Sequence, residues 1–223
     1  MKKLIKILVL TVVMFQFVPL LKAQQAPPFY NEIQQFKKED SAHFPPKNII
    51  LFVGSSSFQK WHDVQNYFPD KPIMNRGFGG SELTDVIRYA NDIIIPYHPK
   101  QIVIYAGEND LAYADTVSAK TVFNRVVTLF NIIRKSLPNV PVIYVSIKPS
   151  PSREKLMPKM EEANKLINHF FQSKKKAVFI DVYHKMLDAN GKPMQDIFVE
   201  DNLHMNAKGY HIWQKAMAPY LVK

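Results

Sequence analysis

The sequence predicts a three-layer α/β/α sandwich around a five-stranded parallel β-sheet. Five short stretches are rich in β-forming residues, and most are continuously apolar, which fits strands that are covered on both faces. Segments with helical spacing of apolar residues separate these stretches. Such repeated alternation of strand and helix is typical of a parallel α/β fold. The predicted strands are residues 48–53, 72–76, 101–106, 140–147 and 177–182.

Each predicted helix has its own signal in the sequence. Ser81 is expected to be the N-cap of the helix that follows the second strand. The next helix places Val126, Leu129 and Ile133 at helical spacing. Pro158 is expected near the true start of the fourth helix, because proline is tolerated in a first turn. The predicted helices are residues 29–38, 82–95, 117–135, 154–173 and 207–221, and 190–191 is a turn signal.

The composition indicates one domain with a substantial core. The chain has 223 residues, 47% of them hydrophobic, and no internal repeat. We expect residues 24–223 to form this domain. The absence of cysteine excludes disulfides, thiolate metal ligands and a cysteine nucleophile. The seven histidines include no closely spaced pair of the kind that binds zinc, so we expect no metal or other cofactor.

The first 23 residues are read as a secretory signal. Three lysines lie within residues 1–6, residues 7–21 are largely apolar, and a small residue, Ala23, closes the segment. The apolar run is short for a membrane span. We expect cleavage after Ala23 and export to the periplasm or the medium, without stable membrane insertion afterwards. The alternative is an uncleaved N-terminal anchor.

The basic charge of the chain does not indicate a nucleic-acid partner. The formal net charge is +10, and residues 1–23 contain four lysines and no acidic residue, so the rest of the chain carries +6. The remaining lysines are scattered except for residues 174–176, where a solvated turn is expected.

Three serines follow the first predicted strand, which ends at Gly54. In parallel sheets, ligands gather at the carboxyl ends of strands, where Ser55, Ser56 and Ser57 are expected. Serine after glycine is also an ordinary helix cap. Phe58 stands where a Gly-x-Ser-x-Gly elbow would need its second glycine. These serines alone therefore do not establish catalysis.

Other polar groups are expected at the same edge of the sheet. A glycine cluster, residues 77–80, follows the second strand, Asn109 follows the third, and Asp201 and His204 precede the last helix. Each has an ordinary structural explanation, in a cap or a turn. Together they match the needs of a serine hydrolase: a base, an acid that orients the base, and donors for an oxyanion. His204 can be the base, and Asp201 can orient its ring.

Four blocks resemble the SGNH hydrolases, also called GDSL-type esterases and lipases, and the resemblance spans the mature chain. The blocks are Gly54-Ser55-Ser56-Ser57, Asn75-Arg76-Gly77-Phe78-Gly79-Gly80, Gly107-Glu108-Asn109-Asp110 and Asp201-Asn202-Leu203-His204. The resemblance implies a flavodoxin-like strand order and serine esterase activity. It also implies that Ser56 is the nucleophile, His204 the base and Asp201 the acid behind it. The oxyanion hole implied is the main-chain N–H of Ser56 and of Gly80 plus the Asn109 amide.

The first block departs from the family pattern. The family usually has Asp before the nucleophile, where this chain has Ser55. We interpret that Asp as an acceptor that shapes the turn, a role that a hydroxyl fills more weakly. Three consecutive serines also leave the nucleophile ambiguous, and Ser56 is favoured because it lies two residues beyond Gly54.

The expected reaction is hydrolysis of carboxylic esters through an acyl-enzyme, and the expected partner is a small-molecule, glycan or lipid ester. We expect short acyl groups, such as acetyl on a carbohydrate, because the chain has no obvious lid insertion. One alternative is a lysophospholipase or thioesterase with a deep apolar groove, for which the candidates are Phe58, Trp61, Phe78 and Tyr113. Another is a carbohydrate-binding protein without catalysis, although a binder does not need a serine, a histidine and an acid together.

Overall fold

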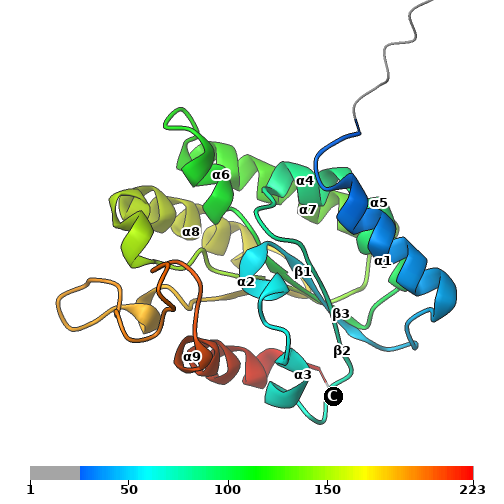
Figure 1. Ribbon diagram of the computed structural model, residues 1–223. Helices are drawn as coiled ribbons and strands as arrows, with labels where there is room; N and C mark the ends of the chain where they lie inside the picture. The colour runs from blue at the N-terminus through cyan, green and yellow to red at the C-terminus, as the bar shows by residue number, and fades with distance from the viewer. Residues whose placement is uncertain (1–25, 223) are drawn as a thin grey trace, which may run out of the picture.

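The computed structural model describes residues 26–222 (Figure 1). The expected secretory signal, residues 1–23, lies outside these described residues. Within residues 26–222, no helix combines the length and the apolar character that crossing a membrane requires.

A five-stranded parallel sheet forms the centre of the molecule. The strand order is β2-β1-β3-β4-β5, so the predicted fold class and the flavodoxin-like order are both confirmed. Gly54 at the end of β1 lies opposite Gly77 of β2 and Tyr105 of β3. The carboxyl ends of these three strands are therefore level, and the loops that follow them start at one edge. The strands are β1 Ile50–Gly54, β2 Ile73–Gly77, β3 Gln101–Tyr105, β4 Val142–Val145 and β5 Ala177–Ile180.

Helices cover both faces of this sheet, as Figure 1 shows. One face packs against α1, α4, α5, α7 and α8, and the other against α2, α3 and α9. The α-helices are α1 Tyr30–Ala42, α2 Ser56–Gln59, α3 Val64–Tyr67, α4 Leu83–Arg88, α5 Ala90–Ile93, α6 Glu108–Tyr113, α7 Ala119–Ser136, α8 Met157–Gln172 and α9 Ala207–Met217. Short 3-10 helices are η1 Ile95–Tyr97, η2 Pro151–Leu156, η3 His184–Met186 and η4 Ala218–Tyr220.

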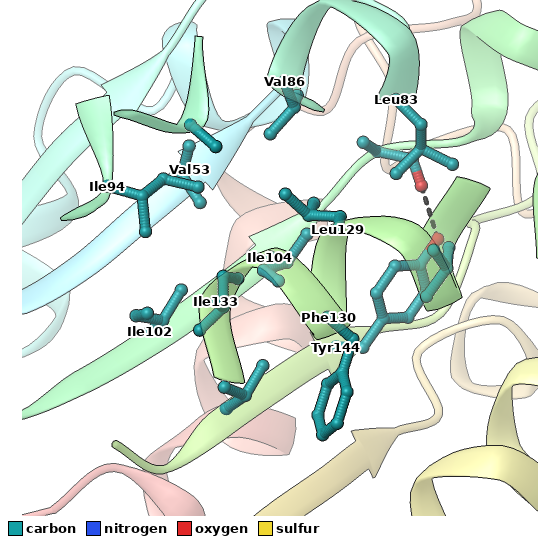
Figure 2. Close-up of a cluster of buried hydrophobic side chains, with 14 of the residues drawn as sticks. Val53, Leu83, Val86, Ile94, Ile102, Ile104, Leu129, Phe130, Ile133 and Tyr144 are labelled. Atoms are coloured by element: carbon teal, nitrogen blue, oxygen red, sulfur yellow. Dashed lines mark hydrogen bonds between the residues drawn. The ribbon is translucent and has the colours of Figure 1, made fainter. Parts of the chain in front are cut away.

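The two faces explain why the strand sequences lack polar alternation. Leu51 and Val53 of β1 point into the core under α4 and α7, part of which Figure 2 shows. Ile50 and Phe52 of the same strand point into the opposite core, with Trp213 of α9. Every residue of β1 is buried. A strand covered on both sides has no solvent face where polar residues would be favoured.

The helix predicted over residues 82–95 is interrupted. It is divided into α4, α5 and η1, and its N-cap is Glu82, which forms a capping box with Asp85. The predicted cap at Ser81 is wrong. The Ser81 hydroxyl is buried and donates instead to the main-chain oxygens of Gly54 and Phe78. It therefore ties the loop after β2 to the end of β1.

Two further differences from the sequence prediction concern α6 and α1. The residues after β3 form α6, which Gly107 permits by adopting a φ of 112°. Buried Asp110 of α6 accepts the main-chain N–H of Leu83 and pairs with Arg125, so it joins α6 to α4 and α7. The first helix, predicted over residues 29–38, extends to Ala42 and packs on the body through buried Ile33, whereas Tyr30 is exposed.

Candidate active site

The turn after β1 exposes Ser56 at the edge of the sheet. Gly54 has a φ of 144°, and a Cβ there would lie 1.8 Å from the main-chain oxygen of Tyr105, so only glycine fits. Ser56 is the first residue of α2 and is half-buried. Ser57 is buried, and its main-chain oxygen accepts the Tyr210 hydroxyl. The two neighbouring serines are thus in different environments.

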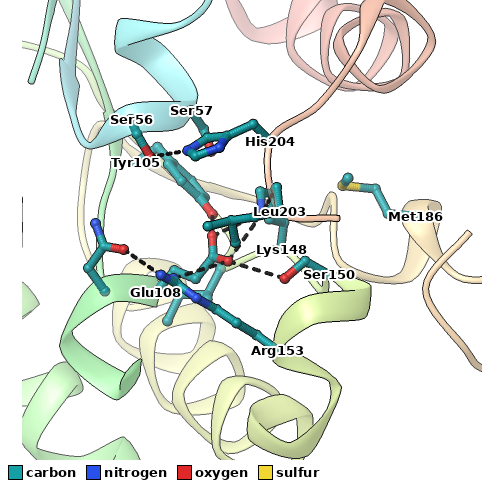
Figure 3. Close-up of polar contacts among 12 residues, drawn as sticks. Ser56, Ser57, Tyr105, Glu108, Lys148, Ser150, Arg153, Met186, Leu203 and His204 are labelled. Atoms are coloured by element: carbon teal, nitrogen blue, oxygen red, sulfur yellow. Dashed lines mark hydrogen bonds and ion pairs between the residues drawn. The ribbon is translucent and has the colours of Figure 1, made fainter. Parts of the chain in front are cut away.

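Ser56, His204 and Asp201 form a continuous chain of hydrogen-bonded side chains. The distance from Ser56 Oγ to His204 Nε2 is 2.9 Å, and the distance from His204 Nδ1 to Asp201 Oδ2 is 2.5 Å. Figure 3 shows the His204 ring facing Ser56. Although the serine and the histidine are 148 positions apart in the sequence, the fold brings them together. Ser56 is the residue of the three-serine run that lies within hydrogen-bond distance of this ring.

Asp201 holds the histidine by its ring and by its backbone. Its Oδ1 atom accepts the main-chain N–H groups of Leu203 at 2.9 Å and of His204 at 2.8 Å. Partial burial of Asp201 favours the neutral acid, but the hydrogen bonds from the His204 ring and from these two N–H groups outweigh it. They lower the pKa of the Asp201 carboxyl below its ordinary value, so it is a carboxylate at neutral pH.

Gly80 and the backbone of Ser56 offer unpaired donors at this edge. Within residues 26–222, no acceptor takes the main-chain N–H of Ser56 or of Gly80. Gly80 has a φ of 80°, in the left-handed region, and a Cβ there would lie no closer than an ordinary contact of 4.0 Å, to Phe29 Cζ. Position 80 therefore requires glycine because of its backbone conformation and not because a side chain would be crowded.

Asn109 lies on α6 directly beyond β3, the strand next to β1. Its Nδ2 donates to the main-chain oxygen of Ser81 at 3.0 Å, and its Oδ1 accepts from Arg153 Nη2 at 3.0 Å. The structure thus places the predicted oxyanion amide on the same edge as Ser56, with one N–H of its side chain still available.

A buried cluster of charged side chains lies beside the site and was not predicted from the sequence. Glu108 is almost fully buried and contacts Lys148, Arg153 and the Tyr105 hydroxyl (Figure 3). Burial alone would raise the pKa of Glu108, but the charges of Lys148 and Arg153 outweigh burial and lower it. The signal available in the sequence was the polar Lys148 directly after an apolar strand.

The aromatic residues considered for an acyl groove divide into two groups. Phe58, Trp61 and Phe78 are fully buried in the two cores, whereas Tyr113 is 76% exposed. A hollow of about 650 Å³ lies between α1 and the end of α2, and Gln59 and the segment of residues 77–78 line it on the side of the site. The other lining residues are Asn31, Glu32, Gln35, Phe36, His62 and Asn75. Most of these residues have polar side chains, although apolar atoms contribute most of the exposed lining surface.

The described part of the chain contains no group of three or more histidine, aspartate or glutamate side chains that could hold a metal ion.

Comparisons with known proteins agree with this geometry. The GDSL-like Lipase/Acylhydrolase family matches residues 49–212, which is more than half of the chain. No curated protein matches the sequence.

Solved structures share the fold at low identity. A proposed acylhydrolase from Bacteroides fragilis is 20% identical, with a TM-score of 0.73, over 85% of this chain and 95% of that one. A GDSL-like lipase from Bacteroides thetaiotaomicron is 19% identical, with a TM-score of 0.71, over 84% and 95%. An acetyl-xylooligosaccharide esterase variant from Geobacillus is 13% identical, with a TM-score of 0.61, over 78% and 94%.

The family match spans β1 through most of α9 and thus includes all four blocks that contain the candidate residues. This chain belongs to the GDSL-like lipase/acylhydrolase family of the SGNH superfamily and is an ester-hydrolysing enzyme.

Proposed function

We propose that the protein is a serine esterase that forms an acyl-enzyme on Ser56. The observation that carries this proposal is the continuous chain from Ser56 Oγ through the His204 ring to the Asp201 carboxylate. With the proton of the neutral ring held on Nδ1 by Asp201, Nε2 is the atom that accepts the serine proton. The three side chains are thus already arranged for proton transfer.

The proposed reaction has two steps. Ser56 Oγ attacks the ester carbonyl and gives its proton to His204 Nε2, which then passes it to the leaving alcohol as the ester C–O bond breaks. A water molecule then gives a proton to His204 and attacks the acyl-enzyme. The proton returns to Ser56 as the carboxylic acid leaves, so the enzyme is regenerated.

The oxyanion formed in both steps requires hydrogen-bond donors. We assign this role to the unpaired main-chain N–H groups of Ser56 and Gly80 and to the side-chain amide of Asn109. Such donors stabilise charge that develops only in the transition state, and the loss of one typically costs about 2.7–4 kcal/mol.

For the substrate, we propose a short acyl group, such as acetyl, on a carbohydrate. The buried positions of Phe58, Trp61 and Phe78 leave these rings unavailable to line a groove for a long acyl chain. The neighbouring hollow provides the side chains of Gln59 and His62, whose polar groups have no partner within residues 26–222. Amide and imidazole groups suit sugar hydroxyls. Two structural neighbours, an acetyl-xylooligosaccharide esterase and an acetyl esterase, carry names that support the same substrate class.

A p-nitrophenyl ester series from acetyl to palmitoyl tests the acyl preference. We expect kcat/KM to be highest for acetyl or propionyl and to fall with chain length. Highest activity on long chains would favour a lysophospholipase or thioesterase instead. A panel of acetylated oligosaccharides then tests the alcohol, because release of acetate faster than from p-nitrophenyl acetate at equal concentration would support a carbohydrate ester.

A further inference from the structure

A carboxylate with two cations beside it is buried next to the proposed site. Glu108 is 4% exposed, and its Oε1 atom lies 3.1 Å from Lys148 Nζ and 3.3 Å from Arg153 Nη1. The Tyr105 hydroxyl donates to its other oxygen. Charges removed from water are costly unless paired, and such a cluster is often no more stabilising than apolar packing. A contribution to the stability of the fold therefore does not explain why this charged cluster lies beside Asn109.

The two ends of the Arg153 guanidinium contact different groups. Nη1 pairs with Glu108, and Nη2 donates to Asn109 Oδ1 at 3.0 Å. Because a guanidinium is a planar fork, fixing one arm on a buried carboxylate also fixes the direction of the other. Glu108 thus anchors Arg153, which also contacts Asn109, the next residue after Glu108 in the sequence.

These contacts determine which way the Asn109 amide faces. Arginine has only donors, so the amide atom that faces it must be the oxygen. The main-chain oxygen of Ser81 has only lone pairs, so the amide atom that faces it must be the nitrogen. Both neighbours require the same orientation, which leaves the second N–H of Nδ2 for an oxyanion. A rotation of 180° would bring Oδ1 round to that side, where its lone pairs would repel the oxyanion.

We propose that Arg153, anchored by Glu108, is a positioning residue that holds the Asn109 amide with its N–H toward the oxyanion. This inference rests on the proposed function, since it requires Asn109 to be an oxyanion donor. Arg153 acts through Asn109 and does not itself contact the reacting atoms. Its effect therefore belongs to the chemical step and not to substrate binding.

The same carboxylate also anchors the other half of the site. Lys148 Nζ donates to the main-chain oxygen of Leu203 at 2.8 Å, directly before His204. Without the Arg153 charge, Glu108 still pairs with Lys148. The buried carboxylate therefore keeps a partner, and the pair has no net charge. We therefore expect Arg153 variants to fold and to retain the histidine segment in place.

A double-mutant cycle between Arg153 and Asn109 tests the proposal, with kcat and KM measured on p-nitrophenyl acetate. We expect Arg153→Met to lower kcat about 10- to 100-fold, up to most of the loss from Asn109→Ala, with KM changed less than threefold. In the Asn109→Ala background, the same substitution should change kcat less than threefold. An equal loss in both backgrounds, or a loss confined to KM, would overturn the proposal.

Arg153→Lys separates the fork from the charge. Lysine keeps the cation beside Glu108 but cannot bond both groups in the same planar geometry, so we expect a loss of kcat similar to that of Arg153→Met. Wild-type kcat in Arg153→Lys would show that charge alone suffices, which contradicts the proposal. Exposed Lys155, two positions away, gives the matched control Lys155→Met, which should keep wild-type kcat.

The same measurements distinguish a failure of the proposed function from a failure of the proposed role of Arg153. Hydrolysis by the wild type and its loss in Ser56→Ala establish the proposed function first. If the wild type hydrolyses no ester of the series, the proposed function fails. If hydrolysis depends on Ser56 but the cycle shows no coupling, the function stands and the role of Arg153 fails.

Discussion

The chain contains two Asp-x-x-His turns with almost the same local geometry. In the first, directly after β5, His184 Nδ1 lies 2.6 Å from Asp181 Oδ2, and in the second His204 Nδ1 lies 2.5 Å from Asp201 Oδ2. In each turn the other carboxylate oxygen accepts the main-chain N–H of the histidine. The spacing alone does not form such a pair, because Asp40 also lies three residues before His43, and its carboxylate contacts Arg76 and the Tyr97 hydroxyl instead.

The two turns differ in what the fold places beyond the ring. The His184 side chain is 65% exposed, whereas that of His204 is 15% exposed and its Nε2 lies 2.9 Å from Ser56 Oγ. Within residues 26–222, His184 has no serine partner. Both turns hold an aspartate–histidine pair, and only the long-range topology of the sheet supplies the nucleophile.

Ser56→Ala should have the largest effect. It removes the serine hydroxyl that lies beside His204 and that has no counterpart beside His184. We expect kcat to fall on the order of 10⁴-fold or more, because among residues 26–222 no other hydroxyl lies within hydrogen-bond distance of His204 Nε2. The assay is hydrolysis of p-nitrophenyl acetate, with circular dichroism to verify folding. Ser57→Ala is the matched control, and its kcat should stay within a few-fold of the wild type.

Substitution of the two histidines tests the comparison directly. His204→Ala should lower kcat about as much as Ser56→Ala, since the serine and its base act as a unit. His184→Ala should leave kcat unchanged within twofold, because that ring is mostly exposed and contacts no nucleophile. Steady-state kinetics of both variants decide the matter, and equal losses in the two would mean that the turns are not functionally distinct.

Substitution of the two aspartates should give a smaller difference in the same direction. Asp201→Asn leaves the shape of the turn but favours the wrong ring tautomer, so we expect kcat to fall about 10³- to 10⁴-fold. Asp181→Asn should have no effect on kcat. A rate for Asp201→Asn close to the wild type would exclude Asp201 as the residue that orients the base.

The smallest effect concerns stability against pH. The pKa of Asp201 is lowered in the folded state, so its charge stabilises the fold above the unfolded value of about 3.9. That contribution is lost as the pH falls through the folded-state pKa. Wild type should exceed Asp201→Asn in free energy of unfolding by on the order of 0.5 kcal/mol at pH 7, since the pair is partly exposed. Urea unfolding followed by the fluorescence of buried Trp61 and Trp213 should show the gap narrowing below about pH 4, and a widening gap would contradict the assignment.

The sequence was sufficient for β1, β3 and β4, because burial on both faces leaves a largely continuous apolar run that is easy to recognise. The four separated blocks, taken together, led to the prediction of Ser56, Asp201 and His204, and the fold brings these three side chains into hydrogen-bond contact. The local pattern could not have chosen His204 over His184, since both follow an aspartate at the same spacing.

Features that depend on long-range contacts were not predictable. The start of α4 with Glu82 as its N-cap, rather than Ser81, depends on the tertiary contacts of Ser81 and Asp110. The contact between Arg153 and Asn109 joins residues 44 positions apart. In the sequence, Arg153 is one of many scattered basic residues, and only the structure shows that one of its arms rests on buried Glu108.

We propose that Ser56 is the nucleophile that a histidine activates. Reaction of the folded protein with a fluorophosphonate probe, followed by mass spectrometry of its peptides, identifies the activated residue. We expect a single covalent adduct on Ser56 that disappears in Ser56→Ala and in His204→Ala but persists in His184→Ala. An adduct on Ser55 or Ser57, or active enzyme that the probe does not label, would contradict it.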